Sequence, residues 1–174
     1  FVGDVDVDGY NDVLIGSAAD WAGLYRGSAT GLMTAPASEH RRSGSRPPLS
    51  TDYFGEDPSG IGDINGDGYP DVAIGGSAHI FRNAGGMIPP RATLALTEGT
   101  LTVGIGDING DGYDDVMNPR AGGLRYGGPD APTTMTAGNF TGLPGDCGEL
   151  VAPGDVNGDG RPDFVVGCPQ NVLG

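Results

Sequence analysis

Four acidic loops of nine residues recur along this chain of 174 residues and constrain its fold more than any other feature. They cover residues 4–12, 63–71, 107–115 and 155–163. Each loop has Asp or Asn at positions 1, 3, 5 and 9 and Gly at position 6. Alternate oxygen-bearing side chains are what a hard cation requires, and the glycine permits the sharp turn that wraps a chain around it. The loops therefore predict cation sites.

The spacing within each loop also predicts the ligands and the cation. In comparable Asp-rich loops the side chains at positions 1, 3, 5 and 9 and the backbone carbonyl at position 7 face the ion. Water or a bidentate carboxylate would complete the roughly six to eight oxygens that Ca²⁺ takes, whereas Mg²⁺ demands a stricter octahedron. We therefore expect about four Ca²⁺ ions, one per loop. The predicted ligands are Asp4, Asp6, Asp8, Tyr10, Asp12, Asp63, Asn65, Asp67, Tyr69, Asp71, Asp107, Asn109, Asp111, Tyr113, Asp115, Asp155, Asn157, Asp159, Arg161 and Asp163.

Two other interpretations of the loops are weaker. An EF-hand requires Glu at position 12 and flanking helices. Position 12 here is Ile15, Ile74, Asn118 or Val166, and the segments after the loops are short, apolar and largely β-branched, as strands are. An ordinary polar turn would explain one loop. Four copies, each with Gly before its first Asp and an apolar segment after it, favour metal binding.

Charge and composition are consistent with metal-binding hairpins. The formal net charge is −14, and the four loops hold fourteen of the Asp residues. Four divalent ions would reduce the net charge to about −6 and relieve the repulsion that opposes compaction. The 34 Gly and 14 Pro, interrupted by regular apolar runs, indicate many short strands joined by tight turns.

The same composition excludes several partners. The chain has no Lys, and its nine Arg form no long basic run, so neither nucleic acid nor an anionic membrane surface is expected as a partner. No stretch of 18 apolar residues predicts membrane insertion. The chain begins at Phe1 without Met or a signal peptide, which we interpret as a processed or excised piece.

Two cysteines, Cys147 and Cys168, flank the fourth loop. A hairpin centred near Asp159 would bring them within bridging reach at its open end. A disulfide there would suit an oxidising compartment, as would millimolar calcium. We therefore expect an extracellular, cell-surface or periplasmic location, and two buried free thiols remain the alternative.

The distance between loops predicts the architecture. The loops begin at residues 4, 63, 107 and 155, and repeats near 40 to 50 residues with about four short strands each are typical of β-propeller blades. We expect an all-β chain of about three and a half four-stranded blades. The blades are residues 1–48, with a truncated first strand, 49–97, 98–140 and a partial fourth at 141–174.

Strands are expected within each unit. They are residues 13–16, 22–25 and a strand near Glu39; 59–62, 72–75, 78–82 and 92–96; 101–105, 115–117, 123–126 and 133–136; and 163–167.

Phe54-Gly55, together with residues 62–75, resembles the FG-GAP repeat of integrin alpha subunits and many secreted bacterial proteins. The Gly-Ala-Pro box is degenerate, as in Gly16-Ser17-Ala18. The resemblance implies a seven-bladed propeller with calcium in the loop between the first two strands of a blade. Two copies of the chain could close such a ring, or the chain could be part of a longer propeller.

No catalytic constellation emerges from the residues. His40 and His79 lie in different units and are expected on strand faces or at the surface, and the clustered carboxylates are already assigned as ligands. We therefore expect no enzyme activity. The first hypothesis is a calcium-stabilised adhesion module that binds a protein or glycan. A sugar-binding lectin, or an accessory domain of a secreted enzyme, remains the alternative.

Overall fold

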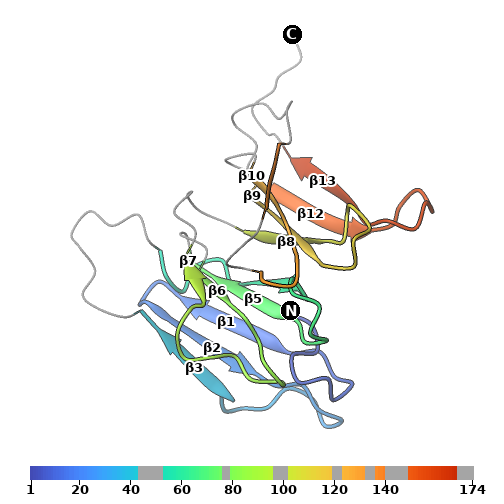
Figure 1. Ribbon diagram of the computed structural model, residues 1–174. Helices are drawn as coiled ribbons and strands as arrows, with labels where there is room; N and C mark the ends of the chain where they lie inside the picture. The colour runs from blue at the N-terminus through green and yellow to red at the C-terminus, as the bar shows by residue number, and fades with distance from the viewer. Residues whose placement is uncertain are drawn as a thin grey trace.

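The computed structural model describes residues 1–42, 53–75, 79–95, 102–118, 123–131, 136–139 and 149–167. Within these ranges all regular secondary structure is β, and it forms four small antiparallel sheets (Figure 1). The predicted all-β class is confirmed.

Each sheet is a meander in which successive strands pair as neighbours. The first sheet contains β1 (Val13–Ser17), β2 (Trp21–Tyr25) and β3 (Ser38–Arg41). The second contains β4 (Ser59–Gly62), β5 (Asp71–Ile74), β6 (His79–Phe81) and β7 (Leu94–Ala95). The third contains β8 (Val103–Gly106), β9 (Asp115–Asn118), β10 (Gly123–Tyr126) and β11 (Thr136–Asn139). The fourth contains β12 (Glu149–Gly154) and β13 (Asp163–Gly167).

Most strands lie where the sequence predicts them, with one clear difference. The last strand of the third unit is predicted at residues 133–136, of which only Thr136 lies within the described residues. There β11 runs past the predicted end to Asn139, because its register pairs Tyr126 with Thr136 and Gly123 with Asn139. In the first unit, Gly3 and Asp12 form an isolated antiparallel bridge ahead of β1.

The first strands of successive sheets approach each other closely. β4 contacts β8, and β8 contacts β12. Glycine makes this approach possible, because a Cβ on Gly104 would lie 2.7 Å from the Cα of Ile61, and one on Gly60 would lie 2.8 Å from the Cα of Val2. Sheets stacked about their first strands are partial β-propeller blades.

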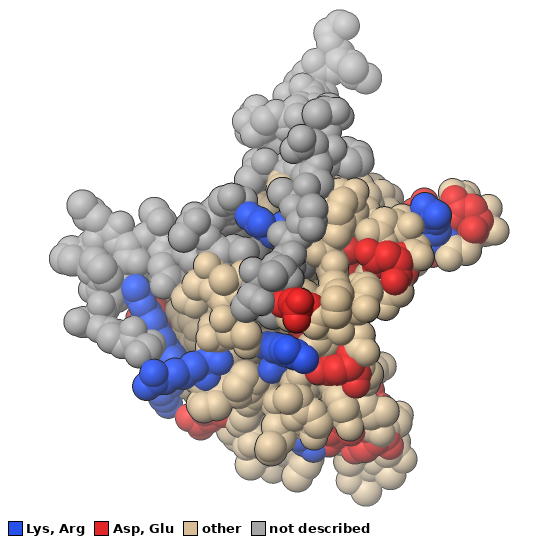
Figure 2. Space-filling model, in the orientation of Figure 1, with Lys and Arg blue, Asp and Glu red and all other residues tan. Residues whose placement is uncertain are grey.

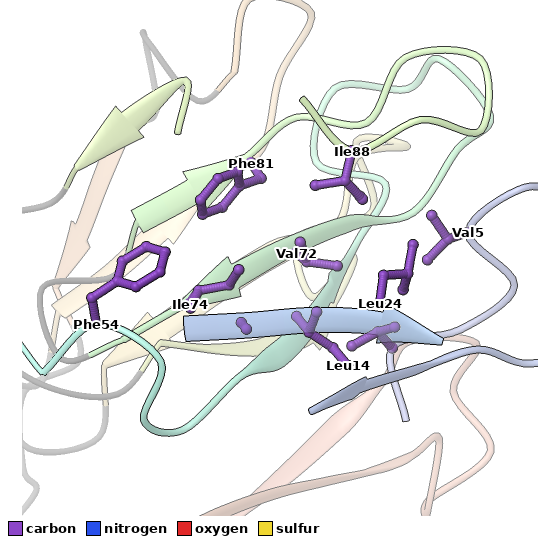
Figure 3. Close-up of a cluster of buried hydrophobic side chains, with 10 residues drawn as sticks. Val5, Leu14, Leu24, Phe54, Val72, Ile74, Phe81 and Ile88 are labelled. Carbon is purple, nitrogen blue, oxygen red and sulfur yellow. The ribbon is translucent and has the colours of Figure 1, made fainter. Parts of the chain in front are cut away.

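The second and third sheets each divide their apolar side chains between two cores. Val72 and Ile74 of β5 face the first sheet, where they pack in a cluster with Leu14 and Leu24 (Figure 3). The intervening Ala73 points the other way, into a second cluster with Ile61, Ile64, Ile80, Val116 and Ala131. A third cluster of Ile105, Met117 and Leu124 packs against Phe164 of the fourth sheet. Because successive side chains of a strand point to opposite faces, one sheet packs against both of its neighbours.

The Phe54-Gly55 pair lies at the seam between the first two sheets. Phe54 is buried in the first cluster, and Gly55 has a φ of 90°. A Cβ on Gly55 would lie 2.3 Å from the carbonyl oxygen of Ser17 and 2.5 Å from that of Trp21. The repeat's Phe-Gly pair therefore packs on the preceding blade, where only glycine fits.

The predicted boundaries between blades, at residues 48/49, 97/98 and 140/141, fall on segments outside the described residues. They remain predictions.

Candidate metal centres

The acidic loops lie at equivalent places in the fold. The second, third and fourth each connect the first strand of a sheet to its second, and a β-bulge precedes each of them. The first is closed by the bridge between Gly3 and Asp12 and leads into β1. Figure 2 shows most of the visible acidic side chains along one side of the molecule.

The position-1 carboxylates accept hydrogen bonds from backbone amides within their own loops. In the second loop, Asp63 Oδ1 accepts hydrogen bonds from the amides of Gly66 (2.8 Å) and Asp67 (3.1 Å), while Oδ2 accepts one from Gly68 at 2.7 Å. Asp107 and Asp155 repeat this pattern. Hydrogen bonds to backbone amides, with that from Gly160 the strongest, hold the pKa of Asp155 below its usual value. Asp155 is thus stabilised in the ionised form that a cation requires.

Positions 3 and 5 bind each other across the loop. In the second loop, the Asn65 amide nitrogen donates to Asp67 Oδ2 at 3.1 Å, and Asn65 Oδ1 accepts from the Asp67 backbone amide at 3.2 Å. The third and fourth loops repeat both bonds with Asn109 and Asn157. Position 7 joins this network through its amide, as when Tyr69 donates to Asp67 Oδ1 at 3.1 Å.

The position-9 carboxylate lies underneath each loop and fixes it to the sheet. Asp71 accepts one hydrogen bond from Ile64, at position 2, and one of 2.7 Å from Asn83, just after β6. Asp12 and Asp115 make the equivalent pairs of bonds. All three are fully buried. Burial raises the pKa of each of the three carboxyls, and that of Asp71 to about 7.

The first loop brings three carboxylates together. One oxygen from each of Asp4, Asp6 and Asp8 lies within 4.8 Å of the others. Asp6 Oδ2 accepts from Arg26, and Arg26 also donates to the Gly86 carbonyl at 2.7 Å. Asp6 Oδ1 is buried and has no hydrogen-bond partner. A buried, unpaired carboxylate oxygen beside two further carboxylates is a donor set that fits a hard cation.

Position 4 distinguishes the first loop from the others. Gly66, Gly110 and Gly158 occupy this position in the later loops with φ between 72° and 79°. The first loop has Val7 there, with a φ of 60°. A β-branched residue in the left-handed region is strained.

Successive loops also contact one another through position 7. A Cβ on Gly66 would lie 2.8 Å from the Tyr113 ring, and one on Gly110 would lie 3.4 Å from the Arg161 guanidinium. In the third and fourth loops, the side chain at position 7 therefore covers position 4 of the preceding loop.

The structure places the twenty predicted ligands in four separate loops. The second, third and fourth share one pattern of hydrogen bonds, and the first has the equivalent bonds to Asp4, Asp8 and Asp12. Their role as ligands remains a prediction. Sequence reasoning missed Arg26, Asn83 and Asp114, which contact the loops from neighbouring strands or sheets. Burial and the nearby carboxylates of Asp63 and Asp107 raise the pKa of Asp114, although its hydrogen bond from Asp63 opposes the shift.

The remaining candidates lie away from the loops. His40 is buried in β3 and packs edge-on against Phe81, and His79 packs edge-on against Phe54. The prediction of a strand-face position is confirmed for both, although His40 belongs to the interior. Cys147 and Cys168 lie outside the described residues. Across the part of the chain that the structure describes, no helix has the length and apolar character needed to span a bilayer.

Comparison with known proteins identifies the repeat. The FG-GAP-like repeat family matches residues 63–117, and the FG-GAP repeat family matches residues 148–172. Chicken integrin alpha-6 is 34% identical over 90 residues, which cover 47% of this chain and 8% of that protein. Human integrin alpha-6 is 38% identical over 88 residues, which cover 47% of this chain and 7% of that protein. Human integrin alpha-E is 30% identical over 115 residues, covering 59% of this chain and 10% of that protein.

The chain thus spans about a tenth or less of the length of these relatives. Both matched segments contain an acidic loop, and the first runs through β8 into β9 of the next sheet. The repeated loops, the stacked meander sheets and these matches agree: the chain contains FG-GAP repeats and is similar to integrin alpha chains.

Proposed function

We propose that this chain is a calcium-stabilised segment of a β-propeller that acts outside the cytoplasm as a binding module for a protein ligand. The observation that carries the proposal is the donor set of the first loop, with three carboxylate oxygens within 4.8 Å and a buried, unpaired Asp6 Oδ1. The other three loops repeat one pattern of hydrogen bonds, and we therefore extend the proposal of calcium binding to them.

Bound Ca²⁺ would neutralise the clustered carboxylates and hold several residues of one loop together by binding their oxygen atoms. The residues that would hold it are those at positions 1, 3, 5, 7 and 9 of each loop. In the second, third and fourth loops the Asn amide group now donates to its neighbouring Asp, and its Oδ1 is the atom with ligand chemistry. The role of calcium is structural, because these side chains fix hairpins at one end of the stacked sheets.

The binding role is supported by the relatives, which are integrin alpha chains. Propeller blades present loops at both ends of their strands, and a scaffold that is rigid at one end can position binding loops at the other. A ring completed by a second copy, or by further blades of the same polypeptide, would supply the remaining sheets. The net charge of −14 disfavours polyanionic ligands.

Calcium binding is tested by native mass spectrometry and by thermal unfolding with calcium or a chelator. We expect bound ions and a midpoint raised by calcium. An unchanged midpoint, with no ion retained at millimolar calcium, would contradict the proposal. The ligand class is tested by binding to arrays of purified extracellular-matrix proteins and of glycans, each with calcium or EDTA. Calcium-dependent protein binding supports the module, whereas hits confined to the glycan array would favour a lectin.

A further inference from the structure

The second acidic loop is held by a carboxylate that belongs to the third loop. Asp114 occupies position 8 of the third loop, between the predicted ligands Tyr113 and Asp115. Its Oδ2 accepts a hydrogen bond of 2.8 Å from the backbone amide of Asp63, which is position 1 of the second loop. Its own amide donates to the Asp63 carbonyl at 3.1 Å. Both the backbone amide and the backbone carbonyl of Asp63 are therefore hydrogen-bonded to Asp114.

Two further contacts fix the backbone next to Asp63. The amide of Gly128, beyond β10, donates to the carbonyl of Ile64 at 2.9 Å. A Cβ on Gly62 would lie 2.0 Å from Asp114 Oδ2, so only glycine permits the carboxylate to reach the Asp63 amide. The third sheet thus determines the backbone path of the residues where the second loop begins.

Position 8 makes a different contact in the other described pairs of loops. Pro70 lies 3.6 Å from a Cβ on Gly3, and Pro162 lies 2.8 Å from one on Gly106. Proline has no amide hydrogen and no side-chain acceptor, so these contacts are apolar. Asp114 replaces an apolar contact with two hydrogen bonds, at a place where an additional carboxylate adds to the local negative charge.

We propose that Asp114 is a positioning residue for the second cation site, and that it couples cation binding in the second loop to cation binding in the third. This rests on the proposed function, since it requires that the loops bind Ca²⁺. The coupling follows from connectivity, because Asp114 lies between two predicted ligands of the third loop and holds the first ligand of the second. Order imposed on residues 113–115 by an ion is transmitted directly to Asp63. The Tyr113 ring, which covers Gly66, adds a second contact between the same two loops.

The test uses the full chain, labelled with ¹⁵N-glycine and titrated with CaCl₂ by NMR. The amide of Gly68, which donates to Asp63, reports the second loop, and that of Gly112, which donates to Asp107, reports the third. The variants are Asp114→Ala, Asp111→Ala to disable the third loop, and the double variant. Pro162→Ala is the matched control at the equivalent position of the next loop.

We expect Asp114→Ala to weaken calcium binding at the second loop about tenfold, because it removes a charge-assisted hydrogen bond to the Asp63 amide. Asp111→Ala should weaken the second loop about fivefold in the wild-type background. In the Asp114→Ala background the effect should fall to about twofold or less, since only the backbone bond of residue 114 and the Tyr113 ring then join the two loops. Pro162→Ala should leave the third loop within about twofold of wild type. Asp114→Asn, which keeps an acceptor oxygen, should restore most of the affinity.

Asp114→Pro provides a second variant should Asp114→Ala fold poorly, since proline already occupies this position at 70 and 162. It should weaken the second loop to a similar degree. An affinity within twofold of wild type in the proline and alanine variants would overturn the positioning role. Equal effects of Asp111→Ala in both backgrounds would overturn the coupling. Wild-type protein that binds no calcium in any loop would instead overturn the proposed function itself.

Discussion

The side-chain amide of Asn83 donates a hydrogen bond of 2.7 Å to the backbone carbonyl of Val5, across 78 positions of sequence. The same nitrogen donates to the Pro70 carbonyl at 3.1 Å, and the Asn83 backbone amide donates to Asp71 at 2.7 Å. Asn83 is fully buried. One side chain thus joins the first two acidic loops.

Asn83→Ala should destabilise the protein by about 2 to 3 kcal/mol, because it leaves the buried carbonyl of Val5 and the partly buried carbonyl of Pro70 without this donor. Urea unfolding followed by circular dichroism measures the change. Met87→Ala, at an exposed position in the same turn, is the control and should shift stability by less than about 0.5 kcal/mol. Equal effects of the two substitutions would contradict the bridging role of Asn83.

Val7→Gly should stabilise the protein by about 1 kcal/mol. It relieves a left-handed valine that costs roughly 1 to 3 kcal/mol, and part of the gain is offset by greater freedom of the unfolded chain. Val156→Gly is the matched control, since Val156 is also exposed, lies in an acidic loop and lacks a positive φ. It should be neutral or destabilising, and a Val7→Gly variant that is no more stable than the wild type would refute the strain.

Gly55→Ala tests the Phe-Gly contact between blades. The new methyl group would meet the carbonyl oxygens of Ser17 and Trp21, so we expect a loss of about 3 kcal/mol or more. Gly31 also has a positive φ but open space around it, and Gly31→Ala should therefore cost only about 1 kcal/mol of backbone strain. Thermal unfolding of the two variants separates crowding from strain, and similar losses would argue against crowding.

The pH dependence of stability should include a contribution from His40. Burial lowers the pKa of His40 from its usual 6.5, and the Pro89 carbonyl opposes this shift without making a hydrogen bond to the buried Nδ1. The unfolded chain therefore binds a proton at higher pH than the folded chain does. This contribution to stability is complete above pH 6.5 and is lost as the pH falls below it.

His40→Gln removes this titration. Urea unfolding at about pH 7.5 and about pH 5.5, in the same calcium buffer, should show a larger loss for the wild type than for the variant. Parallel losses in the two proteins would show that His40 titrates alike in the folded and unfolded chains.

The acidic loops could be located from sequence because their information is local. Gly, Asp and Asn at fixed spacing specify the turn within nine residues, and the bulge before each loop coincides with a glycine. The strands that follow the loops are specified equally locally, since β13 has the predicted bounds and β1, β5 and β9 differ from the predicted ones by about one residue at one or both ends. β11 runs past its predicted end at Thr136 to Asn139, because pairing with β10 determines its register.

The residues that join loops to one another could not be located in this way. Asn83 bonds to Val5, Asp114 to Asp63 and Arg26 to Gly86 over separations of 51 to 78 positions. These pairs depend on how the sheets stack, which the spacing of one repeat does not encode. The strain at Val7 has a sequence signal, because glycine fills that position in the other three loops.

The alternation of Val72, Ala73 and Ile74 between two cores has a mechanical consequence. The second sheet buries apolar side chains against the first sheet on one face and against the third on the other. It cannot detach without exposing the apolar side chains of both neighbouring sheets to water. Under a pulling force, rupture at the second sheet should therefore spread outward in both directions. For the same reason, a protease cut within that sheet should loosen more of the chain than a cut near either terminus.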